Sequence, residues 1–146
     1  MNKRFFFCLL IFFLFLLERI SKYIALHYLG MGLFCCHDFF SLKLFFNPGI
    51  AFGFPLPQVL SLLAALIIII ALLTALIKHW RSWPPVKLLA IQLVIIGAIS
   101  NLLDRIWLGQ VIDFVQLGNW SIFNLADVYI MTGILILIIL GLKKYK

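Results

Sequence analysis

Long apolar stretches separated by short polar segments dominate the chain. The clearest stretch runs from Leu56 to Ile77 without a charged residue. As a helix rising roughly 1.5 Å per residue, it spans about 33 Å, enough to cross a hydrocarbon core of about 30 Å. Three shorter apolar stretches occur at Phe5–Leu17, Leu88–Leu103 and Val128–Leu142. The pattern predicts four membrane helices, over approximately residues 5–27, 56–77, 86–105 and 124–142.

The three shorter stretches can cross a membrane only if each continues through a polar end. Those ends carry Glu18, Arg19 and Lys22; Asn101, Asp104 and Arg105; and Asn124 and Asp127. An ionisable group inside a membrane costs at least ~2.5 kcal/mol on insertion scales, and it usually faces a helix bundle or a wet cavity. We therefore expect these polar side chains to converge just inside the outer membrane face.

Two structural ion pairs are expected among these polar residues. Glu18 and Lys22 are four residues apart, in the favourable order for a pair on one helix face. Asp104 and Arg105 are expected to pair where the third helix leaves the membrane. Glu18, Lys22 and Asp104 are interpreted as structural.

Composition and charge support an integral membrane protein. The chain is 65% hydrophobic and 12% charged, with a mean hydropathy of +1.17, which excludes a water-soluble globule and a disordered chain. We expect one membrane domain over residues 1–146. The net charge is +7, with Lys and Arg concentrated at both termini and between the second and third helices. The positive-inside rule therefore predicts cytoplasmic termini, and lipid rather than nucleic acid as the partner of this charge.

The first outer segment, about residues 28–55, is rich in phenylalanine. Ser41–Phe45 alternates in polarity as a strand does, and Asn47-Pro48-Gly49 is typical of a turn. This segment is either a loop resting on lipid or a platform that holds an extended peptide by strand addition. Together with the second outer segment it predicts a small β-rich extracytoplasmic platform on an all-α membrane fold.

The second outer segment, about residues 106–123, has the sequence pattern of a β-hairpin. Val111–Val115 and Trp120–Phe123 have strand composition, and Gly118-Asn119 between them is typical of a two-residue turn. In that register Asp113 lies opposite Asn124, with Cα atoms about 5 Å apart.

The hairpin leads into the start of the fourth helix. Asn124 is a good N-cap, and Asp127 lies three residues later at N3. The carboxyl groups of Asp113 and Asp127 are therefore expected to approach each other. Two close carboxyls share one proton, as in aspartic proteases, where one takes a proton from water and the other protonates the carbonyl oxygen. Alternatively, Asp127 only caps the helix.

No metal or cofactor is predicted. Cys35 and Cys36 are adjacent, whereas zinc sites usually space their cysteines two to four residues apart. His27 and His37 lie in no recognisable catalytic motif.

Four motifs, in order along the chain, resemble those of the bacterial lipoprotein signal peptidases, also called signal peptidase II. They are Asn47, Gly49, Ala51 and Phe52; Gly97, Asn101, Asp104 and Arg105; Gly109, Val111, Asp113 and Phe114; and Phe123, Asn124, Ala126 and Asp127. The chain departs from the usual pattern at Glu18, Arg19, Pro48, Ser100 and Val128. These departures put efficiency or substrate preference in question, not the reaction.

The resemblance implies a metal-free aspartic endopeptidase of the bacterial cytoplasmic (inner) membrane, with its active site near the outer face. Such enzymes remove the signal peptide from prolipoproteins just before a diacylglyceryl-modified cysteine, and globomycin-type cyclic peptides inhibit them. Asp113 and Asp127 match the catalytic pair. The substrate-contacting or supporting positions fall on Asn47, Gly49, Asn101, Arg105 and Asn124.

Two other functions stay open from the sequence. A small transporter or channel would use the same acids as an ion path, although the polar residues gather at one membrane face. A paralogue that binds lipoproteins without cleaving them would keep the fold.

Overall fold

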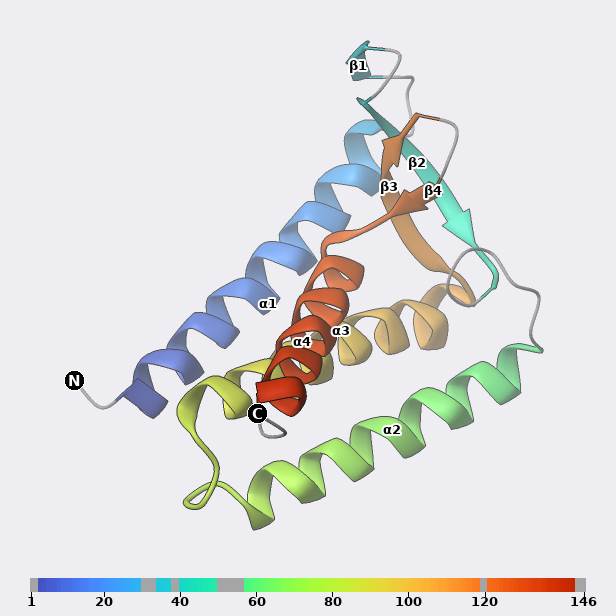
Figure 1. Ribbon diagram of the computed structural model, residues 1–146. Coiled ribbons are helices and arrows are strands. Elements are labelled where there is room, and N and C mark those ends of the chain that lie inside the picture. Colours follow the sequence, from blue (N-terminus) through green and yellow to red (C-terminus); the bar gives the residue numbers. More distant parts are fainter. Residues whose placement is uncertain (1–2, 30–33, 38–39, 50–56, 119–120, 144–146) are drawn as a thin grey trace.

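The computed structural model describes residues 3–29, 34–37, 40–49, 57–118 and 121–143. It is mostly helical, with a small antiparallel sheet at one end of the helices (Figure 1). The helices are α1 (Lys3–Tyr28), α2 (Gln58–Lys78), α3 (Pro85–Leu108) and α4 (Leu125–Lys143). The strands are β1 (Phe34–His37), β2 (Phe40–Asn47), β3 (Val111–Leu117) and β4 (Ser121–Phe123).

Three helices have the length and apolar composition of membrane spans. Among the described residues these are α2, α3 and α4. Helix α1 occupies the first apolar stretch but includes Glu18, Arg19 and Lys22. The chain is therefore a multi-pass membrane protein of at least three apolar spanning helices.

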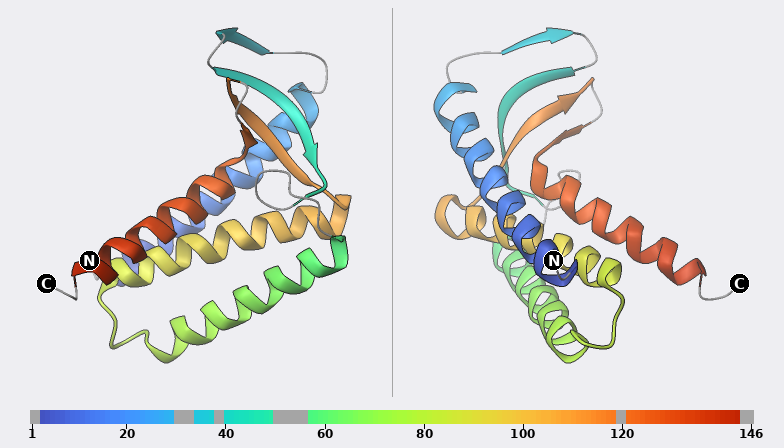
Figure 2. Two further views of the ribbon diagram at one scale, coloured as in Figure 1. Left: turned by 45° about the vertical axis from the view of Figure 1, so that its right-hand side comes forward. Right: turned by 90° about the vertical axis from the view of Figure 1, so that its left-hand side faces the viewer.

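Helix α3 is the centre of the bundle and contacts each of the other helices (Figure 2). Of its most apolar window 56% is buried, against 11% for α2 and 17% for α4. The outward faces of α2 and α4 remain apolar and exposed, as expected of surfaces that contact lipid hydrocarbon.

A glycine permits the close packing of α3 on α4. A Cβ atom added at Gly97 would lie 2.5 Å from the carbonyl oxygen of Ala126 and 2.7 Å from the Ile130 side chain. The two backbones can approach this closely only because residue 97 has no side chain. This contact fixes the start of α4 beside the middle of α3.

The sheet has the order β1-β2-β3-β4, with every pair antiparallel. It lies beyond the last turns of α1, where Ile112 and Phe114 of β3 pack with Ala25. The expected strand Ser41–Phe45 is part of β2. Strand β3 pairs along β2 from Phe40 to Asn47, whereas β1 pairs only with its first residues, Phe40 to Leu42.

The hairpin exists, but its predicted register is wrong by one residue. Val115 pairs with Phe123 and Leu117 with Ser121, so residues 118–120 form a three-residue connection. The expected turn residue Asn119 and strand residue Trp120 lie outside the described residues. Asp113 is consequently not paired with Asn124 through the backbone.

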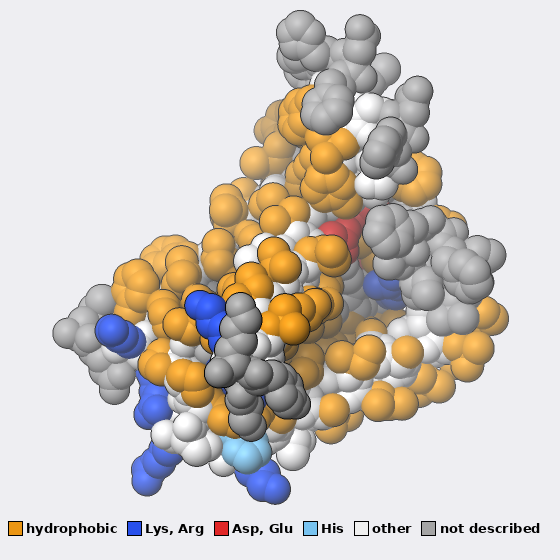
Figure 3. Space-filling model, in the orientation of Figure 1, with side chains coloured by type: hydrophobic (Ala, Val, Ile, Leu, Met, Phe, Trp, Pro, Cys, Tyr) orange, Lys and Arg blue, Asp and Glu red, His pale blue; other side chains and the backbone are white. Residues whose placement is uncertain are grey.

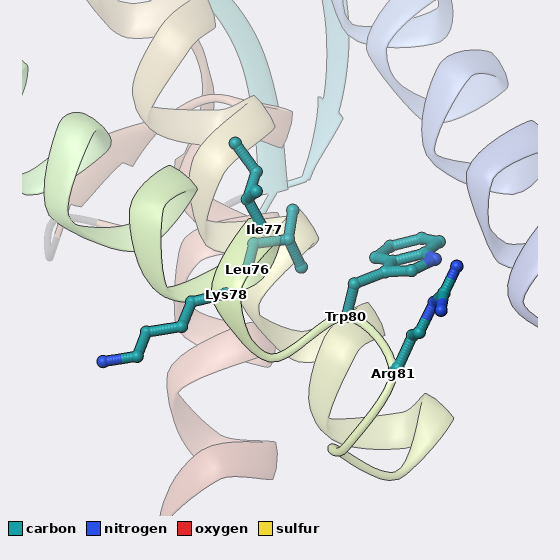
Figure 4. A pocket seen from close by; sticks show the side chains of 5 residues that line it. All are labelled: Leu76, Ile77, Lys78, Trp80 and Arg81. Carbon is teal, nitrogen blue, oxygen red and sulfur yellow. The ribbon is translucent and has the colours of Figure 1, made fainter.

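Basic side chains gather at the end of the molecule away from the sheet (Figure 3). There an open pocket of about 530 Å³ is lined by Leu76, Ile77, Lys78, Trp80 and Arg81. Trp80 and Arg81 point to one side and Lys78 to the other (Figure 4). The side chain of Arg4 donates to the carbonyl oxygen of Arg81 at 3.0 Å, which ties α1 to this loop.

Candidate active site

Asp113 and Asp127 line one cavity of about 650 Å³ between the sheet and the helices. Asn47, Asn101 and Arg105 also line it. Acidic and basic atoms are visible together in this hollow (Figure 3). Of the polar side chains expected to converge from the helices, Asn101, Arg105 and Asp127 line this cavity.

Asp113 reaches the cavity because the chain reverses sharply after α3. Gly109 ends that helix with a φ of 74°, in the left-handed region that favours glycine. The chain then returns as β3, which pairs with β2 so that Asp113 lies opposite Phe45. The Nδ2 group of Asn47 donates to Asp113 Oδ2 at 3.0 Å, and that of Asn124 donates to Oδ1 at 2.6 Å.

Asp127 is fixed by the first turn of α4. The backbone N–H of Asn124 donates to Asp127 Oδ2 at 3.2 Å, and the N–H of Asp127 donates to Asn124 Oδ1 at 3.0 Å. This reciprocal pair is a capping box, and it confirms Asn124 as the N-cap. The same Asn124 side chain contacts Asp113. The two aspartates thus meet at Asn124, although the strand register differs from the prediction.

Asn101 joins the aspartates to the interior of the bundle. Its Nδ2 group donates to Asp127 Oδ1 at 2.9 Å, while its Oδ1 accepts from Asn124 at 3.2 Å and from Lys22 Nζ at 2.8 Å. An ammonium group can only donate, so Lys22 determines which way the Asn101 amide faces.

Lys22 belongs to a buried ion cluster. Its Nζ lies 2.7 Å from Glu18 Oε1 and 2.7 Å from Asp104 Oδ2, and all three side chains are at most 1% exposed. The expected Glu18–Lys22 pair is confirmed. Asp104 has a second ion-pair partner in α1: Arg19 Nη1 lies 2.7 Å from Asp104 Oδ1. The ion-pair partners of Asp104 are therefore Lys22 and Arg19 instead of the expected Arg105.

Arg105 instead contacts the turn after β2. Its Nη2 donates to the carbonyl oxygen of Gly49 at 2.9 Å. Within that turn, the Gly49 N–H donates to Asn47 Oδ1 at 2.9 Å, which confirms the expected turn and directs the Asn47 amide nitrogen to Asp113. Ala51 and Phe52 of the same motif lie outside the described residues.

Three departures from the family pattern contact one another. Arg19 Nη1 donates to Ser100 Oγ at 3.0 Å, and the Ser100 hydroxyl donates to the Glu18 carboxylate. The sequence predicted no role for Arg19 or Ser100. The sequence offered one indication of this contact: Glu18 and Arg19 lie in the first helix and Ser100 in the third, and the polar ends of these two helices were already expected to converge.

The surroundings of Asp113 raise the pKa of its carboxyl group. The pKa of this carboxyl is raised from 3.8 to about 6: burial is the largest cause and the nearby Asp127 also raises the pKa, while the hydrogen bonds from Asn47 and Asn124 and the charge of Lys22 lower it. A carboxyl with this pKa exchanges its proton near neutral pH, as acid–base chemistry requires. Among the described residues, no group of three His, Cys, Asp or Glu side chains is arranged to hold a metal.

Known proteins are similar to this chain in sequence. Residues 10–143 match the family model described as signal peptidase (SPase) II. A lipoprotein signal peptidase of Syntrophus aciditrophicus is 36% identical over 143 residues, which cover 90% of this chain and 88% of that protein. One from Syntrophomonas wolfei is 45% identical over 102 residues, covering 68% of this chain and 66% of that protein.

Solved structures agree with the fold. A bacterial membrane enzyme determined by the in meso method at 2.3 Å resolution superposes with a TM-score of 0.84 at 27% identity, covering 96% of this chain and 89% of that one. A second, at 1.9 Å resolution, gives a TM-score of 0.82 at 28% identity, covering 94% and 92%. The family match covers nearly the whole chain, and the chain therefore belongs to the signal peptidase II family of membrane peptidases.

Proposed function

We propose that the protein is an aspartic endopeptidase that removes signal peptides from diacylglyceryl-modified prolipoproteins, cutting before the lipidated cysteine. The observation that carries this proposal is that Asp113 and Asp127 line one cavity and are joined through the amides of Asn124 and Asn101. The family membership supports the substrate class, since its relatives are named lipoprotein signal peptidases.

The two carboxyl groups divide the acid and base roles. We assign the shared proton to Asp113, because its pKa is the one raised, to about 6. Asp127 accepts N–H bonds to both of its oxygens at the N-terminus of α4. In the proposed step Asp127 takes a proton from water as that water attacks the peptide carbonyl. Asp113 then protonates the carbonyl oxygen as the tetrahedral intermediate forms.

The remaining cavity wall suits a lipid-embedded substrate. It is built by apolar side chains of three helices, among them Ile68 of α2, Val94 and Ala98 of α3, and Ile130 and Met131 of α4. An apolar signal peptide and acyl chains match this wall in polarity. Asn47 and Arg105, at the polar end of the cavity, are proposed to support the substrate near the scissile bond, with Gly49 anchoring Arg105.

The proposed topology has four spans in the bacterial cytoplasmic membrane, with residues 1–146 acting as one peptidase domain. Helix α1 is the fourth span, because the charges of Glu18 and Lys22 neutralise each other inside the bundle. Basic side chains at the end away from the sheet support cytoplasmic termini, and the candidate active site then lies near the outer face.

Cleavage of a synthetic lipidated precursor by protein in lipid nanodiscs tests the proposal. Asp113→Asn and Asp127→Asn should each lower turnover by about 10²–10⁴-fold, the usual contribution of a positioned acid or base. Lys43→Met, an exposed position on β2, is the control and should leave turnover unchanged. A globomycin-type cyclic peptide should inhibit the wild type. Normal turnover by either Asn variant would refute the acid–base assignment, and a wild type that binds without cleaving would be a non-enzymatic relative.

A further inference from the structure

Strands β3 and β4 contribute to the cavity wall in different ways. Strand β3 contributes Val111 and Asp113, which are alternate residues. Strand β4 contributes three consecutive residues, Ser121, Ile122 and Phe123. Successive side chains of a strand point to opposite faces of the sheet. A cavity bordered by consecutive residues meets more than one face of β4, which is consistent with contact along its edge, whereas it meets only one face of β3.

The edge of β4 that borders the cavity has no strand partner among the described strands. The sheet order is β1-β2-β3-β4, and β4 pairs with β3 alone. Apolar side chains such as Val128 and Met131 line the same cavity. Backbone N–H and C=O groups beside an apolar, lipid-facing space need hydrogen-bond partners.

We propose that the free edge of β4 (Ser121–Phe123) binds the cleaved chain as an added strand. This inference rests on the proposed function and names how the peptide backbone is held. An extended peptide offers alternating donors and acceptors along one side, which is what a strand edge recognises. An acyl chain offers none, so lipid is the poorer occupant.

The position of this edge relative to the aspartates supports the proposal. Phe123 directly precedes Asn124, whose side chain contacts Asp113 at 2.6 Å and whose backbone contacts Asp127. A peptide paired with β4 therefore runs past both carboxyl groups within a few residues. Strand pairing would hold the scissile bond at a fixed register, as hydrolysis by two positioned acids requires.

Ester substitution in the substrate tests the pairing. Single backbone amides of a synthetic lipidated precursor are replaced by esters, one position at a time, across the scissile bond. An ester removes one donor, so kcat/KM should fall about 3- to 10-fold at alternate positions and change little at those between. Esters placed far towards the N-terminus of the signal peptide are the matched control.

A uniform or absent effect on a peptide that is cleaved normally would overturn the inference and leave the proposed function standing. Failure to cleave the all-amide peptide would refute both.

Hydrogen exchange provides a second measurement that does not depend on turnover. In Asp113→Asn protein, adding the lipidated precursor should slow exchange of backbone amides within residues 121–123 by about 3- to 10-fold, the effect of one added hydrogen bond. Vesicle lipid alone should not. Equal protection by lipid alone, or none with the bound precursor, would overturn the inference.

Discussion

Lys22 is the residue whose replacement tests the buried charge balance most directly. Its Nζ, on a side chain that is 1% exposed, contacts Glu18 and Asp104 at 2.7 Å each and Asn101 at 2.8 Å. Lys22→Met keeps a long apolar stem but leaves two buried carboxylates facing Arg19 alone. Removing one partner of a buried ion pair costs about 3–5 kcal/mol, so the free energy of unfolding should fall by that amount.

The charge balance predicts that a second substitution compensates for the first. Glu18→Gln alone leaves one excess positive charge in the cluster. The double variant Glu18→Gln/Lys22→Met retains the Arg19–Asp104 pair at 2.7 Å and is neutral again. Its loss of unfolding free energy should therefore be smaller than the sum of the two single losses, with a coupling of about 2–3 kcal/mol, at the upper end for residues in one network.

Equilibrium unfolding in mixed micelles at constant pH measures these free energies. Lys43→Met makes the same chemical change at an exposed position of β2 and should alter stability by no more than about 0.5 kcal/mol. Strictly additive single losses would refute charge balance as the stabilising principle. They would mean that each side chain contributes separately, by packing.

Two further changes probe the pKa of Asp113 and the contact between α3 and α4. Asp113 has its pKa raised to about 6 from 3.8, so the folded state binds this proton more tightly than the unfolded chain does. Wild type should lose about 3 kcal/mol of stability relative to Asp113→Asn as pH rises from about 3 to 7, and parallel pH curves for the two proteins would contradict this. Gly97→Ala would bring a Cβ to 2.5 Å from Ala126 O and should cost about 1–3 kcal/mol in thermal unfolding. Gly141→Ala, with nothing within 4 Å, is the control, and equal effects would contradict the close contact.

Features governed by local rules could be predicted from the sequence. The helices follow from apolar stretches bounded by polar or proline-containing segments. The start of α4 follows from Asn124 and Asp127 at capping-box spacing, and the turn at Asn47 follows from its side chain and the glycine two residues later. The cap and the turn each depend on residues within three positions of one another, and the helices on the composition of one continuous segment.

Features that depend on one residue of loop length, or on the rotation of one helix against another, could not be predicted. The connection of residues 118–120 differs from the expected two-residue turn by one residue, which shifts every pair of β3 and β4. The partners of Asp104 likewise depend on how α1 packs on α3. Arg105 is the neighbour of Asp104 in sequence, but Arg19, from another helix, approaches it to 2.7 Å.

The candidate site was nevertheless predictable because it does not depend on the hairpin register. Backbone pairing of Asp113 with Asn124 was the wrong reason for their proximity. The correct reason is that Asn124 ends the hairpin and caps α4 at once, so its amide can accept from Asp127 N–H and donate to Asp113. A register shift of one residue moves the strand backbone by a few ångströms. A side-chain amide at the junction absorbs that shift, and the two carboxyl groups still face one cavity.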